Sequence, residues 1–273
     1  MSTRIISAAI AIAIAIVIFL LHNTFVFTLA IALVSLCAVY ELLKAVKCTD
    51  FLVPTLICAA YSFGYFYVDK IDSVYINGYF WQGLFISVLM VTFFKYHEKI
   101  NYYQMAFMTV VTLLVPMAMS PLVVMNDNYP DLFFVILTLC GAWLADSGAY
   151  FAGTFLGKHK LCPSISPKKT IEGLVGGVVT NGVIFLIICL VYDKVIKDDG
   201  IAFNYFWIFV AGMVCAVVGL IGDLTASLIK RQCGIKDYGN IMPGHGGVMD
   251  RFDSVLFVAP FMYYLLMTGI LFN

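Results

Sequence analysis

The sequence predicts an all-α integral membrane protein: a polytopic bundle of about nine transmembrane helices with a polar cavity that faces the cytosol. Of its 273 residues, 62% are apolar and only 12% are charged, and the mean hydropathy is +0.97. Soluble domains carry roughly 45–50% apolar and about 25% charged residues. Polar residues concentrate in the second half of the chain, which is where the cavity is expected.

Nine apolar runs predict the helices, because each is long enough, or nearly so with tilt, to cross a bilayer. They cover residues 5–21, 24–41, 51–68, 74–94, 104–125, 132–153, 173–192, 203–229 and 254–272. The first run ends at Leu21-His22-Asn23 without a small-x-small cleavage site. It is therefore expected to stay as a span and not to be removed as a signal peptide.

The basic residues predict the orientation. With nine spans, 13 of the 16 Lys and Arg residues fall on one side, and only Lys70, Lys194 and Lys197 fall on the other. The positive-inside rule then places the N-terminus in the cytosol. The compact length and few loops favour a bacterial inner membrane, with the endoplasmic reticulum as the open alternative.

Two regions with different tasks are expected. Residues 1–130, with about five spans, are assigned to helix packing, dimer contact and the lipid bilayer. Residues 131–273, with about four spans, are assigned to catalysis, with cytosolic loops at 154–172 and 230–253. The eight cysteines show no CxxC pair or metal-ligand spacing and are expected to be reduced packing residues. No nucleic-acid partner is expected.

Asp223 lies inside the eighth apolar run, where a carboxylate costs roughly 2.5–3.5 kcal/mol at mid-bilayer. Asp223, Ser227 and Lys230 are spaced i, i+4, i+7 and share one helical face. Ionisable groups within a membrane are usually functional. The alternative is a buried Asp–Lys pair that only locks helices together.

The segment after this run is too polar and glycine-rich to cross a membrane. Glycines let backbone N–H groups approach a phosphate closely, and Lys and Arg supply the opposite charge. His245 could donate to a phosphate or order the loop. The candidate phosphate-binding residues are Lys230, Arg231, Lys236, His245, Gly246 and Gly247, and Asp237 is a further candidate substrate-binding residue.

Asp250-Arg251-Phe252-Asp253 is expected to open the last helix. Asp250 and Asp253, at i and i+3, would project from the same side. Ligand sets made only of carboxylate oxygens suit Mg²⁺. Charge complementation at a helix N-terminus would explain one Asp, but not a pair that flanks Arg251.

The loop after the sixth run contains Ser166-Pro167-Lys168-Lys169. Ser166 and Pro167 suit the N-cap and first-turn positions of a helix, which would aim free N–H groups and two lysines at an anion. A basic cluster that binds anionic lipid headgroups is the alternative. Asp146, on the preceding helix, favours a site.

Small residues recur every four positions on both sides of this loop. Ala149, Gly153 and Gly157 precede it, and Gly173 and Gly177 follow it. This small-xxx-small spacing predicts close helix packing.

The run from Ser227 to Asp253 resembles the signature of the phosphatidate cytidylyltransferase family, the CDP-diacylglycerol synthases. It matches at essentially every specified position across 27 residues. Met242 departs from the usual Leu, Ile or Phe, a swap that conserves volume. The Asp146 region and residues 166–170 are also similar, so the specific resemblance covers about residues 140–272.

The resemblance implies a multi-span, often dimeric enzyme that joins CTP to phosphatidic acid, making CDP-diacylglycerol and pyrophosphate. It also implies Mg²⁺, with K⁺ as a candidate second cation. Asp223 and Asp250 would be metal ligands, and Asp253 a supporting carboxylate or third ligand. The expected catalytic residues are Asp223, Asp250, Lys230 and His245. The expected substrate-binding residues are Asp146, Ser166, Lys168, Lys169, Ser227, Lys230, Arg231, Lys236, Asp237, His245, Gly246, Gly247 and Arg251.

Three other functions stay open. A CTP-dependent polyprenol kinase would release CDP, whereas a cytidylyltransferase releases pyrophosphate. A cytidylyltransferase for an ether lipid would differ in its acceptor. A transporter usually shows internal repeats or broken helices in both halves, whereas the polar residues here crowd into one half.

Overall fold

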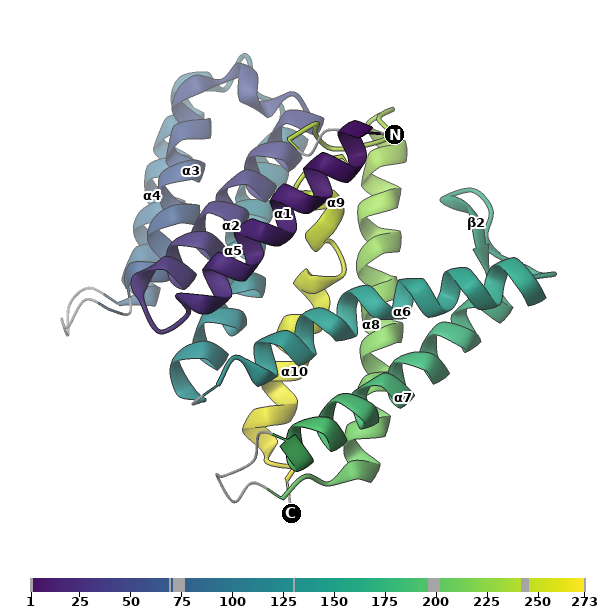
Figure 1. The fold of residues 1–273 in the computed structure, drawn as a ribbon. Helices are drawn as coiled ribbons and strands as arrows, with labels where there is room; N and C mark the ends of the chain where they lie inside the picture. Colours follow the sequence, from purple (N-terminus) through teal and green to yellow (C-terminus); the bar gives the residue numbers. More distant parts are fainter. Residues whose placement is uncertain are drawn as a thin grey trace. The chain divides into compact units, whose positions relative to one another are not determined.

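The computed structural model describes residues 2–68, 70, 77–129, 131–195, 202–241 and 246–272, with the side chains of residues 2–5 left out (Figure 1). Within these ranges, each of the nine predicted apolar runs forms a helix. The helices are α1 Ser2–Leu20, α2 Phe25–Ala45, α3 Leu52–Val68, α4 Gly78–Tyr96, α5 Tyr102–Asn128, α6 Phe133–Leu156, α7 Ile171–Val195, α8 Tyr205–Gln232 and α10 Val255–Thr268. Shorter elements are η1 Cys48–Asp50, β1 Lys160–Cys162, β2 Ser166–Thr170 and α9 Met249–Phe252.

Six of the described helices, α2 and α4 to α8, are long and apolar enough to cross a membrane. Leu52–Val68 and the Ile6–Leu20 part of α1 are shorter apolar helices, and α10 has 14 residues. The prediction of an all-α membrane protein is therefore confirmed, apart from one small hairpin. The crossing of all nine runs stays a prediction.

The chain groups into two compact units. The first contains Met1–Asp127 and Gln232–Phe252, and the second contains Asn128–Arg231 and Asp253–Asn273. The first unit thus combines the N-terminal helices with a segment from near the C-terminus. The functional division expected at residue 130 stays a prediction.

In the first unit, α2 packs against α3 and buries one face of its 21 residues. This face carries Phe27, Leu43 and the carboxylate of Glu41, each 2% exposed or less. The helix begins at Thr24, whose hydroxyl accepts the Val26 N–H at 3.2 Å and so caps the N-terminus. Glu41 is the one charged side chain among the buried residues of this helix.

In the second unit, α6 and α7 lie side by side (Figure 1) and approach closely through small residues. A Cβ added at Gly177 would lie 2.8 Å from the Ala145 carbonyl oxygen and 3.0 Å from Ala149 Cβ. One added at Gly173 would lie 2.8 Å from the Ala149 carbonyl oxygen and 3.3 Å from Gly153 Cα. The small-xxx-small prediction is confirmed, because only glycine permits this spacing.

Asn181 joins three helices of this unit. Its side chain is fully buried and donates to the Gly141 carbonyl in α6 at 3.2 Å and to the Gly212 carbonyl in α8 at 2.8 Å. These bonds spare the amide nitrogen the desolvation cost of an unpaired polar group, whereas the buried Oδ1 has no hydrogen-bond partner among the described residues. The helices that carry Asp146 and Asp223 are thereby tied to the same side chain.

The α6–α7 connection is a β-hairpin, and the expected helix start at Ser166 and Pro167 is wrong. Ser166–Thr170 is extended and pairs antiparallel with β1, and α7 begins at Ile171. The cap is supplied four residues later than expected, because the Thr170 hydroxyl accepts the Gly173 N–H at 3.1 Å. Strand pairing therefore takes precedence over the local helix-start signal.

Glu172 closes the base of this hairpin. Its carboxylate accepts the backbone N–H groups of Lys158 and His159 at 3.1 and 3.2 Å, and it contacts His159 Nδ1 at 2.7 Å. Backbone groups beyond the end of α6 are thereby fixed to the first turn of α7. Glu172 therefore holds the two ends of the hairpin that carries Lys168 and Lys169.

Gly177→Ala is expected to lower the stability of the protein by about 1–3 kcal/mol, because the added methyl group overlaps α6. Gly83→Ala in α4 is the matched control. A Cβ there meets nothing within 4 Å, and alanine should stabilise the helix by about 0.5–1 kcal/mol. Reversible unfolding in detergent measures both. Equal effects of the two changes would contradict the close packing.

Candidate active site

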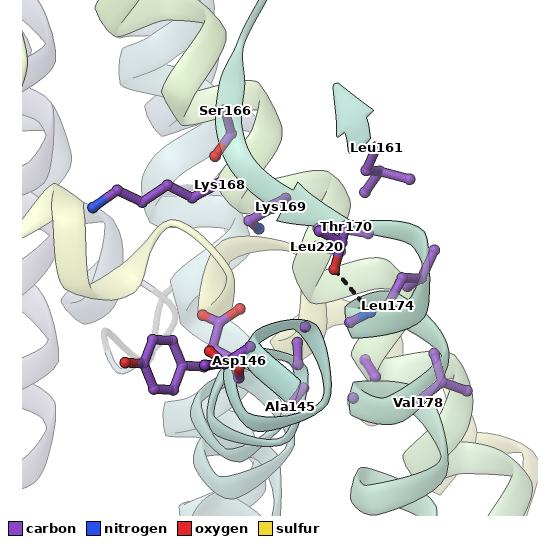
Figure 2. Close-up of a pocket in the computed structure, with 17 residues that line it drawn as sticks. Ala145, Asp146, Leu161, Ser166, Lys168, Lys169, Thr170, Leu174, Val178 and Leu220 are labelled. Atoms are coloured by element: carbon purple, nitrogen blue, oxygen red, sulfur yellow. Dashed lines mark hydrogen bonds between the residues drawn. The ribbon is translucent and has the colours of Figure 1, made fainter. Parts of the chain in front are cut away.

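A pocket of about 390 Å³ lies in the second unit, among α6, α7, α8 and the hairpin (Figure 2). Its polar lining includes Asp146, Ser166, Lys168 and Lys169. Its apolar lining includes Ala145, Leu174, Val178, Ala216 and Leu220. A concave, mostly apolar surface with a few convergent charges is typical of a small-molecule site. Four predicted substrate-binding residues therefore line one pocket.

Figure 2 shows Asp146 on α6 and Lys169 on β2 directed into this pocket, while Lys168 extends away from α7. The Lys169 ammonium forms an ion pair with the Asp223 carboxylate of α8. Both side chains are 22% exposed, so the pair is only partly screened by solvent. The hairpin and α8 are thus joined at the charges expected to bind substrate.

The predicted shared face of Asp223, Ser227 and Lys230 is confirmed in part by a direct contact. The Ser227 hydroxyl donates to Asp223 Oδ1 at 3.3 Å, one helical turn away. The alternative interpretation of Asp223 is an Asp–Lys pair that locks helices together, and the ion pair observed for Asp223 is with Lys169 of the hairpin. Lys230 is itself buried, with 9% of its surface exposed.

Asp253 is the most buried of the predicted metal ligands, with 8% of its surface exposed. Burial raises the pKa of its carboxyl to about 7, with a further rise from Asp223 and, more weakly, Asp146, while Lys230 opposes the shift. Like charges within range disfavour ionisation. Burial is thus the main reason that this carboxyl keeps its proton, and the neighbouring carboxylates add to the effect.

The expectation that Asp250 and Asp253 open one helix is wrong. Asp250 lies in the short helix α9, which ends at Phe252, and α10 begins at Val255. Between them, Asp253 Oδ1 accepts the Ser254 N–H at 2.7 Å. Such a local side-chain bond competes with helical hydrogen bonding and explains the break.

Asp250, in the first unit, is surrounded by the glycine-rich segment. Its Oδ2 accepts the backbone N–H of Tyr238 at 2.8 Å and that of Gly247 at 3.0 Å. Gly246 has φ +87°, and a Cβ there would lie 3.0 Å from the same oxygen. Glycine meets both requirements, a left-handed backbone and a close approach. The segment folds around a carboxylate.

Glu41 is a site residue that the sequence patterns did not reveal. It accepts the Val248 N–H at 3.1 Å and the Met249 N–H at 2.8 Å, at the start of α9. The available signal was an ionisable side chain near the end of an apolar run, the same signal that identified Asp223. Amides expected to face a phosphate bind Glu41 and Asp250 in the structure.

The other predicted residues are on the surface or outside the described residues. Lys168, Arg231, Lys236, Asp237 and Arg251 are exposed, and Arg231 Nε donates to the Ile165 carbonyl at 3.4 Å. His245 lies outside the described residues. Asp223 and Asp253 belong to the second unit and Asp250 to the first. A metal shared by the three stays a prediction.

The carboxylates suit Mg²⁺ in chemistry, because they are oxygen donors. In the described part of the chain, no group of three or more His, Cys, Asp or Glu side chains is arranged to hold a metal ion. Mg²⁺ commonly takes one or two carboxylates and completes its shell with water and substrate phosphates. The donor set fits that kind of site.

Without metal, the stability of the protein is expected to fall as the pH rises from 4 to 7. Folded Asp253 keeps its proton to about pH 7, whereas the unfolded carboxyl releases it near its ordinary value of 3.8. The folded state then binds more protons in this window, and each unit of raised pKa corresponds to about 1.4 kcal/mol. Asp253→Asn should flatten the slope, as measured by unfolding in detergent with a chelator. An unchanged slope would contradict the buried carboxyl.

Comparison with known proteins agrees with the motifs. A sequence model described as the cytidylyltransferase family matches residues 2–268. A phosphatidate cytidylyltransferase of Bacillus subtilis is 33% identical over 250 residues, 88% of each chain, and one of Haemophilus influenzae is 29% identical over 285 residues, 96% of each. One of Staphylococcus aureus is 42% identical over 137 residues, 50% of this chain and 49% of the other. The chain belongs to the cytidylyltransferase family.

Proposed function

We propose that the protein is a phosphatidate cytidylyltransferase, which converts CTP and phosphatidic acid into CDP-diacylglycerol and pyrophosphate. The observation that carries the proposal is similarity along nearly the whole chain to relatives with this name, over 88% and 96% of its length. The pocket supports it, because two lysines and a carboxylate meet there beside an apolar wall. A lipid phosphate and a nucleotide both require such a mixture.

The reaction is an in-line transfer at the α-phosphorus of CTP. An oxygen of the lipid phosphate forms a bond to this phosphorus. The bond from the phosphorus to the oxygen that leads to the β-phosphate breaks, and pyrophosphate leaves with the electron pair. The attacking oxygen is already anionic, so neither a general base nor a covalent intermediate is needed. Catalysis then consists of positioning and charge neutralisation.

Five basic residues bind the two anions in this proposal: Lys168, Lys169, Lys230, Arg231 and Lys236. Lys169 is the best placed, because Asp223 orients its ammonium at the pocket. Asp146 contacts the cytidine or supports the charges around Asp223. His245, Gly246 and Gly247 belong to the same substrate-binding set. The acyl chains lie between helices, open to the bilayer.

Mg²⁺ is the proposed cofactor, with K⁺ as a candidate second cation. Asp223, Asp250 and Asp253 would hold the metal, which, when bound, neutralises charge on the nucleotide phosphates. The oxygen donors and the repulsion around Asp253 support this assignment. Ser227 steadies Asp223 through its hydrogen bond.

The proposed setting is a bacterial inner membrane, with nine spans, a cytosolic N-terminus and a cavity that faces the cytosol. The lopsided placement of Lys and Arg supports this orientation. CTP is a polar cytosolic nucleotide and therefore requires access from that side. In this proposal two copies of the chain form a homodimer in the membrane.

Asp223→Asn and Asp250→Asn are each expected to lower turnover by roughly 100-fold or more, because each removes a charge that stabilises the transition state. Purified variants are assayed with radiolabelled CTP and phosphatidic acid at saturating Mg²⁺. Asp127→Asn is the control, since this carboxylate is 44% exposed and pairs with Lys70. Near-parental turnover in either site variant would show that the metal assignment is wrong.

The products distinguish the proposed reaction from its rivals. The parental enzyme is expected to release one pyrophosphate per CTP with phosphatidic acid, and a chelator should abolish turnover until Mg²⁺ is restored. Parallel assays offer a polyprenol and an ether-lipid phosphate as acceptors. CDP formed with the polyprenol would instead identify a kinase, and preference for the ether lipid would identify the other cytidylyltransferase.

A further inference from the structure

Glu41 is a buried acidic residue in the first unit that the proposed reaction does not use. It lies near the end of α2 and is 2% exposed. Burial of a carboxylate is costly unless it is hydrogen-bonded. Its two oxygens accept one backbone N–H each, Oε1 from Val248 and Oε2 from Met249. Hydrogen bonds to a charged acceptor are roughly twice as strong as neutral ones.

Two glycines of the loop are explained by the closeness of this carboxylate. A Cβ added at Gly239 would lie 2.9 Å from Glu41 Cδ, and one added at Gly247 would lie 2.6 Å from it. Neither glycine has the positive φ found at Gly234 and Gly246, so backbone conformation is not the reason for glycine. Gly239 and Gly247, eight positions apart, thus both lie against the Glu41 side chain.

The same segment holds Asp250. Tyr238 and Gly247 donate their N–H groups to Asp250 Oδ2, while the neighbouring Gly239 and Val248 contact Glu41. The loop therefore lies between two carboxylates, and a shift of either one displaces the same backbone. Of these two carboxylates, Glu41 is the one held in place, because it belongs to a long packed helix.

We propose that Glu41 is a positioning residue, which fixes the glycine-rich loop and thereby sets the orientation of Asp250. The catalytic consequence rests on the proposed function, but the structural one does not. Glu41 touches no reacting atom in this proposal, since both of its oxygens bind backbone amides. Its role differs from general stabilisation because its contacts are with one segment, residues 238–241 and 246–250 of the described chain.

Hydrogen–deuterium exchange without metal or CTP tests the structural consequence. Glu41→Gln keeps the size of the side chain, but its amide nitrogen cannot accept a hydrogen bond. The remaining amide oxygen can still accept one N–H, so at least one of the Val248 and Met249 amides is expected to exchange at least tenfold faster. Ser35→Ala is the control, because Ser35 is fully buried in the same helix and its hydroxyl has no hydrogen-bond partner among the described residues. It should leave these amides unchanged.

Kinetics test the catalytic consequence. Glu41→Gln is expected to lower kcat at least tenfold, to raise the Mg²⁺ concentration for half-maximal activity, and to leave the KM for CTP within about twofold. Gly247→Ala should have a similar effect through its overlap with Glu41. In a Glu41→Ala background, Gly247→Ala should lower kcat little further, because the truncated side chain no longer overlaps the added methyl group.

Unchanged exchange at residues 248 and 249 in Glu41→Gln would overturn the proposal, as would fully additive losses in the Glu41–Gly247 pair. If Glu41→Gln does not fold, Gly247→Ala alone decides: parental exchange and kcat would overturn the proposal. If the parental protein does not convert CTP and phosphatidic acid, the proposed function fails. The exchange result then still decides the role of Glu41.

Discussion

The structure depends on how acidic side chains are accommodated among apolar helices. A carboxylate removed from water needs an ion pair or hydrogen bonds. Asp223 has the Lys169 ammonium, and Glu41 and Asp250 each have two backbone N–H donors. Asp253 accepts the Ser254 amide, but burial and the neighbouring Asp223 outweigh this bond and raise its pKa. Glu41 and Asp250 thereby bind the same loop, whereas Asp223 and Asp253 bind groups of the second unit.

Asp223 lies on α8 in the second unit, where small residues and a buried amide hold the helices together. Gly173 and Gly177 let α7 lie against α6, and Asn181 binds carbonyls of both α6 and α8. In a bilayer, where lipid competes equally well for apolar contact, close packing and interhelical hydrogen bonds provide much of the association. A site whose charges come from separate helices needs such a scaffold.

The sequence predicted features that depend on local periodicity. Apolar runs indicated the helices, and the spacing of Asp223 and Ser227 indicated their contact, because both follow from helix geometry. The hairpin before α7 was missed, since Ser166 and Pro167 are good helix starters and strand pairing overrode them. The role of Glu41 was also out of reach: its partners lie more than 200 residues away. Long-range contacts leave no local pattern.

The composition of the first unit has a consequence for biosynthesis. Its segment Gln232–Phe252 leaves the ribosome long after α2, so the Glu41 carboxylate has none of its loop donors while most of the chain is being inserted. Contacts of such high sequence separation form late and slowly. The first unit therefore stays incomplete until late in synthesis. A chain that stops before residue 248 lacks both N–H donors of the Glu41 carboxylate. Both hydrogen bonds to Glu41 therefore form only after residue 249 has been made.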